Sequence, residues 1–165
     1  MPSCDELFLS HALDEHVELR VQAMFYHDVG ETIDFSNEQS QLDYRLAKTA
    51  DIPALNAVKD SIIDDPLTWI QRNELHVGYL YDELVAIGVI ESSPFWPQQA
   101  SIGMMTYESY RQRGIGTQTL LYLKQACRDN GILAVAGCGY RNTNSQKTLQ
   151  AARMVSVTRL LKLSF

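Results

Sequence analysis

The feature that most restricts the fold of this chain is a hexapeptide with two glycines, Arg111–Gly116 (RQRGIG), between two segments of different periodicity. Residues 101–106 (SIGMMT) before it form a short apolar run of the kind found in strands. Residues 116–130 after it repeat apolar side chains at helical spacing, and the Asn-Gly pair at 130–131 supplies a helix stop. The sequence therefore predicts a strand joined by a tight glycine turn to a helix.

The same hexapeptide has the composition of an anion-binding loop. Gly114 and Gly116 lack Cβ atoms, so the backbone there can wrap closely around a ligand. Backbone N–H groups at the start of a helix, together with the helix dipole, attract a diphosphate. Arg111 and Arg113 add positive charge, and Thr117 follows in the first helical turn.

Taken alone, the hexapeptide fits a diphosphate-binding loop and an ordinary turn with two solvated arginines equally well. It is not a P-loop, because the Gly-Lys-Ser/Thr ending is absent, and it lacks the third glycine of a dinucleotide fingerprint. Its late position, after an antiparallel-looking series of strands, is a further difference from a dinucleotide-binding unit. The position between a strand and a helix favours the diphosphate-binding interpretation.

The rest of the chain predicts an α/β (α+β) domain with a mixed central sheet flanked by helices. The two strands on either side of Asp82-Glu83 have the pattern of a hairpin. Strands are expected at 44–47, 77–81, 84–91, 132–140 and 157–165, and helices at 54–63, 67–72 and 142–152.

Residues 1–42 carry two competing patterns. Apolar side chains between residues 17 and 25 alternate as in a strand, whereas those between residues 13 and 25 also recur at helical spacing. We favour the helix, and we expect the polar stretch 34–41 to be a linker. Residues 1–42 are therefore predicted to be an N-terminal extension of uncertain structure packed on a domain formed by residues 43–165.

The composition excludes several classes of protein. Hydrophobic residues make up 45% and charged residues 21%, as in an ordinary globular domain, and the net charge of −6 argues against nucleic-acid or anionic-membrane binding. No segment approaches the roughly 20 apolar residues of a membrane span, and the N-terminus lacks the basic start of a secretory signal. The three cysteines form no CxxC pair, and the four histidines have no metal-ligand spacing. We expect a cytoplasmic protein with no nucleic acid, membrane or metal to bind.

Three segments in order resemble the GNAT (GCN5-related) N-acetyltransferase superfamily. Arg111–Gly116 matches its [Arg/Gln]-x-x-Gly-x-[Gly/Ala] signature for coenzyme A, and residues 44–53 resemble its opening strand and first helix. Asn142–Ser145, followed by Leu149 and Met154, resembles its N-x-x-S…L…GF segment. The resemblance covers residues 43–165. It departs from the family at Arg153-Met154, where the family usually has Gly-Phe, which predicts an altered turn.

The resemblance implies direct transfer of an acetyl group from acetyl-CoA, as co-substrate, to a primary amine of a small molecule or peptide. It also implies the GNAT fold and a homodimer, with which the 45% hydrophobic content is compatible. Asn142 and Ser145 fit a contact with the cofactor and a helix cap equally well. The expected cofactor-binding residues are Met104, Met105, Thr106, Arg111, Gln112, Arg113, Gly114, Ile115, Gly116, Thr117, Asn142 and Ser145.

The catalytic groups are less defined by the sequence. Base catalysis needs a carboxylate, or a water held by polar groups, within reach of the amine. Glu91 is the best carboxylate candidate because residues 101–106 contain no Glu, although we favour its interpretation as a solvated strand end. The family's usual acid, a Tyr, is replaced here by Leu149, and Tyr140 is the candidate substitute or a rim side chain. We interpret Cys138 as a small core residue, since direct transfer needs no acyl-enzyme.

Two functions from different classes fit these residues. The first is an acetyl-CoA-dependent N-acetyltransferase. The second is a catalytically silent GNAT-like domain that binds acyl-CoA as a sensor or interaction module, which the missing strand Glu and the Leu149 substitution favour.

Overall fold

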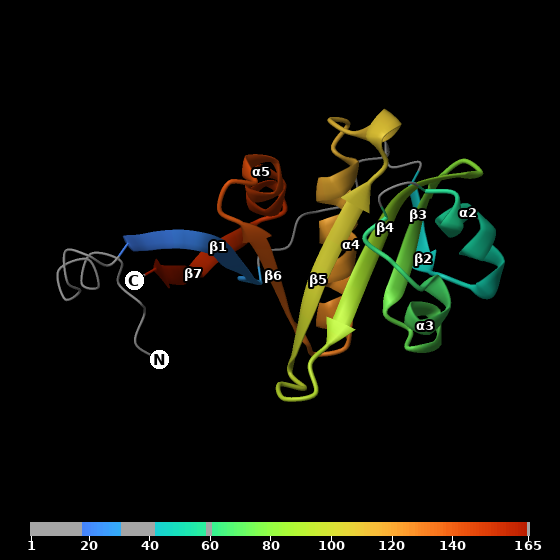
Figure 1. Cartoon of the computed structure of the whole chain (residues 1–165). Helices are drawn as coiled ribbons and strands as arrows, with labels where there is room; N and C mark the ends of the chain where they lie inside the picture. Colours follow the sequence, from blue (N-terminus) through green and yellow to red (C-terminus); the bar gives the residue numbers. More distant parts are fainter. Residues whose placement is uncertain (1–17, 31–41, 59–60, 165) are drawn as a thin grey trace.

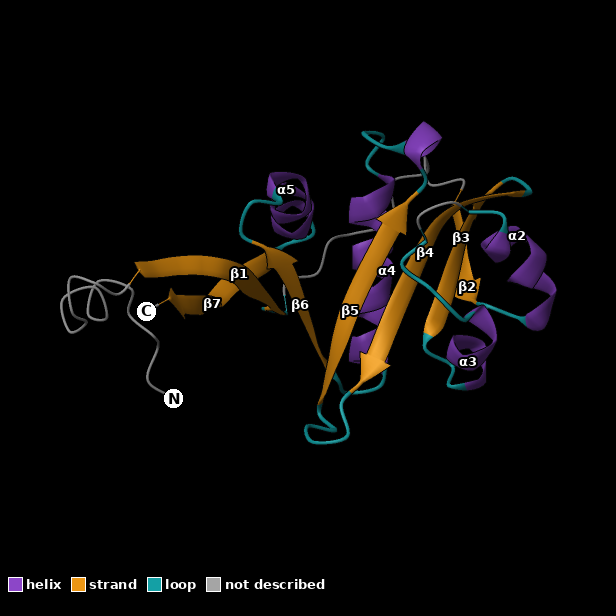
Figure 2. Cartoon of the chain, in the orientation of Figure 1, coloured by secondary structure: helices purple, strands orange, loops and turns teal. Residues whose placement is uncertain are grey.

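The computed structural model describes residues 18–30, 42–58 and 61–164, and within them the chain builds one mixed seven-stranded sheet with helices on its faces (Figures 1 and 2). The strand order is β2-β3-β4-β5-β6-β1-β7. The strands are β1 (Glu18–Asp28), β2 (Leu42–Leu46), β3 (Leu75–Leu80), β4 (Glu83–Ser92), β5 (Gln99–Thr106), β6 (Leu133–Gly139) and β7 (Met154–Ser164). The helices are η1 (Thr49–Asp51), α2 (Ile52–Asn56), α3 (Pro66–Gln71), η2 (Glu108–Tyr110), α4 (Ile115–Asp129) and α5 (Thr143–Ala151). The predicted α/β class is confirmed.

The first three strands of the sheet order, β2 to β4, have helices on both faces, whereas β5 is covered by α4 on one face. Helix α4 lies behind β4 and β5 in Figure 1, where Leu120 and Leu123 are fully buried against Ile102 of β5. On the other face, α2 and α3 pack through Leu55 and their neighbours on Ile87 of β4. All pairs in this part are antiparallel, including the predicted hairpin of β3 and β4.

Residues 18–28 form strand β1, so the helix that we favoured over this stretch is wrong. β1 lies between β6 and β7 and is antiparallel to both. Met24 and Tyr26 point to the core beneath α4 and α5, whereas Phe25, between them, points to the opposite face and is 38% exposed. The alternating pattern thus prevailed over the helical spacing, because strand partners more than 100 residues away satisfy the backbone of β1. Residues 13–17 and 34–41 lie outside the described residues.

Helix α2 is shorter than predicted. The sequence predicted a helix over 54–63, but α2 ends at Asn56. Further along, the hydroxyl of Ser61 accepts a hydrogen bond from the backbone N–H of Ile63 at 3.1 Å, a local turn that competes with a helical ladder. This turn lets Ile63 pack beside Leu55 in the core. The remaining predicted elements are observed with ends shifted by three residues at most.

Candidate functional site

The site is built on a fork between the two parallel strands of the sheet. β5 and β6 pair only where Gln99–Ser101 lies beside Leu133–Val135. Beyond Ser101 the remainder of β5, up to Thr106, has no such pairing with β6 within the described residues. Because a parallel pair that stops early leaves its strands free to separate, ligands can enter from the carboxyl ends of the strands.

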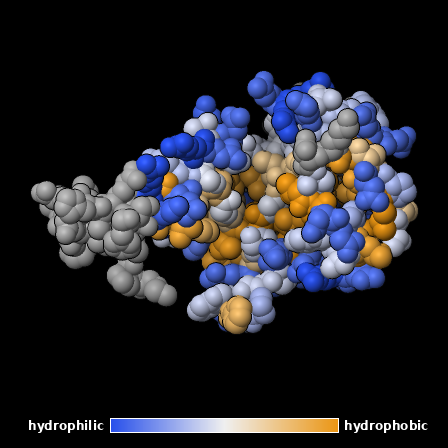
Figure 3. Space-filling view, in the orientation of Figure 1, coloured by the Kyte–Doolittle hydropathy of each residue, from blue (hydrophilic) through white to orange (hydrophobic). Residues whose placement is uncertain are grey.

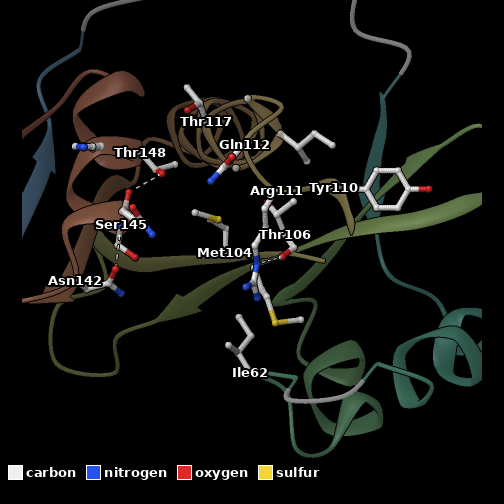
Figure 4. Close-up of a pocket in the computed structure, with 16 residues that line it drawn as sticks. Ile62, Met104, Thr106, Tyr110, Arg111, Gln112, Thr117, Asn142, Ser145 and Thr148 are labelled. Carbon is white, nitrogen blue, oxygen red and sulfur yellow. Dashed lines mark hydrogen bonds between the residues drawn. The ribbon is translucent and has the colours of Figure 1, made fainter. Parts of the chain in front are cut away.

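A cavity of about 700 Å³ occupies the open end of this fork (Figure 4). Three segments form its walls: the end of β5, the loop Arg111–Gly116 with the start of α4, and the first turns of α5. We call Arg111–Gly116 the glycine loop. The lining residues are Ile62, Met104, Met105, Thr106, Tyr110, Arg111, Gln112, Gly114, Ile115, Gly116, Thr117, Asn142, Asn144, Ser145, Lys147 and Thr148. This set includes every residue that we expected to bind the cofactor except Arg113.

The glycine loop presents backbone N–H groups to the cavity. Gly114 is the N-cap of α4 with φ +78°, and Gln112 has φ +62°, both in the left-handed region that glycine adopts most easily. No described side chain caps α4. The N–H groups of its first turn, from Ile115 to Thr117, therefore lack intrahelical partners and face an anion with the positive end of the helix dipole.

Close packing explains the second glycine of the motif. A Cβ atom on Gly116 would lie 3.0 Å from Cε of Met104 and 3.3 Å from Cγ2 of Thr148. The glycine thus keeps open the narrow space where α4, β5 and α5 meet.

The two arginines of the loop are placed differently. Arg111 lines the cavity, and its Nε donates a hydrogen bond to the backbone oxygen of Thr106 at 3.3 Å, which fixes the guanidinium beside the β5 terminus. Arg113 instead lies over the ring of Tyr110, 5.2 Å from its centroid, and is not part of the lining. Lys147 on α5 supplies a second cation at the cavity wall.

Polar groups of α5 and β5 also line the cavity. The side-chain oxygen of Asn142 accepts a hydrogen bond from the N–H of Ser145 at 3.1 Å, so Asn142 caps α5 while both residues also line the cavity. On β5, the hydroxyl oxygen of Thr106 is buried and has no hydrogen-bond partner among the described residues. A buried hydroxyl without a partner suits a wall that meets a polar ligand.

Neither catalytic candidate lies on this cavity. Glu91 is near the end of β4 at the far side of the fork, where it lines a second cavity of about 320 Å³. Tyr140 follows the end of β6 and is 47% exposed. Leu149 is a buried core residue, and burial raises the pKa of the Cys138 thiol, which disfavours the nucleophilic thiolate.

The sequence did not point to several residues of the cavity. Asn144, Lys147 and Thr148 lie on the α5 face that includes Ser145, at spacings of three and four residues. Helical spacing from Ser145 could therefore have predicted these residues from the sequence. Ile62 lies between α2 and α3, and no local pattern connects it with the loop.

Comparison with known proteins gives the family. Residues 41–152 match the model described as the acetyltransferase (GNAT) family. The chain belongs to this family. No curated protein matches the chain in sequence.

Solved structures share the fold. A GNAT-family acetyltransferase from Colwellia psychrerythraea superposes with a TM-score of 0.79 at 20% identity, covering 90% of this chain and 57% of that one. A GNAT-family protein from Novosphingobium aromaticivorans gives 0.67 at 16% identity, with 92% and 69% covered. A Salmonella typhimurium protein, solved with its cofactor acetyl-CoA, gives 0.57 at 18% identity, with 74% and 90% covered. This chain therefore spans little more than half of the Colwellia protein.

No helix among the described residues is long and apolar enough to cross a membrane. No group of three or more His, Cys, Asp or Glu side chains in the same ranges could hold a metal ion.

Proposed function

We propose that this protein is an N-acetyltransferase that uses acetyl-CoA and transfers the acetyl group directly to a primary amine. The observation that carries the proposal is the cavity in the fork, which joins the glycine loop, the end of β5 and the cap of α5. Two of these segments, Arg111–Gly116 and Asn142–Ser145, are separated by 25 residues of sequence and match two motifs of the family.

The walls fit the parts of acetyl-CoA. The unpartnered N–H groups at the start of α4, with Arg111 beside them, suit the diphosphate. Met104 and Met105 offer apolar contact for an extended arm along β5, and the Thr106 hydroxyl offers a hydrogen bond to one of its amides. At about 700 Å³ the cavity is within the range of small-molecule and cofactor sites.

The reaction sets requirements for the groups around the thioester. The amine nitrogen forms a bond to the acetyl carbon while the carbon–sulfur bond breaks; the amine loses a proton and the departing thiolate gains one. Glu91 stays our proposal for the base, reached directly or through water, and Tyr140 for the acid. Because Glu91 does not line the large cavity, it would act on an amine that lies beyond it. Tyr140, which follows β6, would donate its proton to the sulfur through water.

The experiment for the loop uses two glycines at opposite ends of α4. Gly114 and Gly131 have φ +78° and +67°, and no described atom lies within 4 Å of a Cβ built on either. Gly114→Val should weaken acetyl-CoA binding at least about 100-fold, because the side chain blocks the diphosphate. Gly131→Val introduces similar strain away from the cavity and should leave the affinity unchanged. Equal affinity of the Gly114→Val and wild-type proteins in calorimetric titration would refute the loop assignment.

A catalytically silent acyl-CoA-binding module is the second candidate. Burial of Leu149, at the position of the family's tyrosine, and the absence of Glu in β5 favour it. An assay of thiol release over a panel of amines separates the two functions. Acetyl-CoA binding without turnover on any small or peptide amine would support the silent module.

We also propose a cytoplasmic homodimer. β7 is at the edge of the sheet and exposes Val155, Val157 and Leu160, each 46–48% exposed. An edge strand with exposed apolar side chains is a common surface for association. Light scattering coupled to size exclusion tests this, and a monomer mass at micromolar concentration would contradict it.

A further inference from the structure

A row of cross-strand neighbours lies at the base of the fork. Glu91 of β4 is directly opposite Ser101 of β5, Ser101 is beside Val135 of β6, and Val135 is opposite His27 of β1. Side chains at such paired positions point to the same face of a sheet. The row thus places a carboxylate next to the residue at which β5 and β6 come together.

This face is the one away from α4. The neighbouring residues Ile90, Ile102 and Ala134 pack in the core beneath α4, so Glu91, Ser101 and Val135 point the other way. Figure 3 views the sheet from this side and shows apolar side chains around the centre of the face, ringed by hydrophilic ones.

The large cavity reaches this face through the fork. Met104 lines it from the α4 side, whereas Met105 and Ile62 line it from the side of α2 and α3. A ligand arm that enters at the glycine loop can therefore emerge on the face of Glu91. Ser101 is three residues before Met104, about 10 Å along the strand, and pairing with β6 closes the passage there.

A second cavity of about 320 Å³ lies on the paired segment itself and includes Ser101 and Val135, the last pair of β5 and β6. Glu91, Ser101 and Val135 line it together with Gln99 and with Trp96 of the β4–β5 loop, which is 64% exposed. Its volume is at the lower limit of small-molecule sites and far too small for a folded partner.

We propose that this second cavity holds the acceptor, and that the acceptor is a small primary amine with a flat apolar body. The proposal rests on the proposed function. The Glu91 carboxylate binds the ammonium by a charge-assisted hydrogen bond and then takes one of its protons, directly or through water, which leaves the neutral amine that attacks. The Ser101 hydroxyl offers a second polar contact. The Trp96 ring covers the apolar body. The amine nitrogen then lies at the base of the fork, beside the end of the acyl-carrying arm.

The test uses steady-state kinetics with 2-phenylethylamine and n-butylamine as acceptors. Glu91→Gln should raise KM for both amines about tenfold, as expected for the loss of a charge-assisted contact, and leave KM for acetyl-CoA within twofold of wild type. It should also lower kcat for both amines, because Glu91 is the proposed base. Trp96→Leu should raise KM for 2-phenylethylamine and not for n-butylamine. Asp82→Asn, in the turn at the other end of β4, removes the same charge and should change neither amine.

The results separate this inference from the proposed function. An unchanged KM for both amines in Glu91→Gln, while the wild type remains active, would overturn the acceptor site alone. A raised KM for the amines in His27→Gln, together with an unchanged KM in Glu91→Gln, would also overturn it. That result would place the amine on the other side of Val135. If the wild-type protein acetylates peptide amines only, the acceptor site proposed here is also wrong. If it does not bind acetyl-CoA, the proposed function is wrong as well.

Discussion

The two halves of the sheet are stabilised in different ways. β2 to β4 lie between helices on both faces, β5 joins them with one face under α4, and Val77 and Ile87 are fully buried. β6, β1 and β7 pack on α4 and α5 with one face, whereas the other exposes Phe25 and Val155 at 38% and 48%. We call these the covered half and the open half.

The open half relies on buried charges in addition to apolar contact. Asp28 at the end of β1 is bound by two nitrogens of Arg128, each at 2.7 Å, and lies 3.1 Å from Nζ of Lys124. Lys124 is itself buried and donates to the backbone oxygen of Ala152 at 2.7 Å, which joins β1, α4 and the end of α5. Burial alone would raise the pKa of Asp28, but the hydrogen bonds from Arg128, Gly30 and Lys124 hold it below its ordinary value. The comparison teaches that a half-covered sheet can be fixed by a few buried charges.

The largest expected effect is on this charged cluster. Asp28→Asn should lower the free energy of unfolding by about 3 to 5 kcal/mol, because it leaves the Lys124 ammonium buried without its counter-charge. Urea denaturation measures the change. Asp129→Asn, on the exposed end of α4, is the control and should cost less than about 0.5 kcal/mol. Similar small costs for both variants would mean that the open half does not depend on the cluster.

The covered half should respond to pH through His76. Its ring is buried between β3 and α4, where Nδ1 lies 3.1 Å from the hydroxyl oxygen of Tyr122, and burial lowers its pKa from 6.5 to about 4. Because the unfolded chain binds a proton more readily, the contribution of His76 is fully present above pH 6.5. It is lost as the pH falls towards 4, by about 3 kcal/mol in total.

Denaturation between pH 4 and 7 measures this contribution. His76→Gln should be less stable than wild type at pH 7 and should lose the part of the pH dependence that begins near pH 6.5. An unchanged slope in that variant would assign the pH dependence to other groups.

The sequence was informative where the structure depends on neighbours in the chain. The glycine loop, the stop of α4 and the Asn142 cap all involve residues within a few positions of one another, and all were predicted. Within the cavity, Arg113 is the exception. Its position within the loop is that of a ligand-binding cation, but its guanidinium lies over the Tyr110 ring and not on the cavity wall. No local pattern shows which of two arginines has an aromatic ring nearby.

The sequence was less informative where partners are distant. β1 has a helical and an alternating pattern at once, and only pairing with β6 and β7 decides between them. Asp28 could not be connected with Lys124 and Arg128, 96 and 100 positions further along the sequence. The same holds for Glu91 and Val135, which the parallel pairing of β5 and β6 brings into one row.

Arg153 offers a smaller test of the open half. It occupies the family's glycine position between α5 and β7 and has φ +57°, in the left-handed region that glycine adopts most easily. Arg153→Gly should therefore raise the free energy of unfolding by about 1 kcal/mol, because glycine adopts this conformation without a Cβ penalty. Arg153→Ala keeps the Cβ atom and should show no gain. Equal stability of the glycine and alanine variants would indicate that the turn carries no strain.

The smallest expected effect compares one substitution in the two halves. Val157→Thr on β7 replaces a side chain that is 47% exposed, and it should change the free energy of unfolding by less than about 0.5 kcal/mol. Val77→Thr on β3 places the same hydroxyl in the fully buried core and should cost about 1 to 3 kcal/mol. Urea denaturation at low and at high protein concentration sharpens the result, because the proposed homodimer would form at the higher one. A loss of unfolding free energy in Val157→Thr that appears only at high protein concentration would mean that a second copy covers the open half. A loss above about 1 kcal/mol at low concentration would show that Val157 is as buried as Val77 in solution.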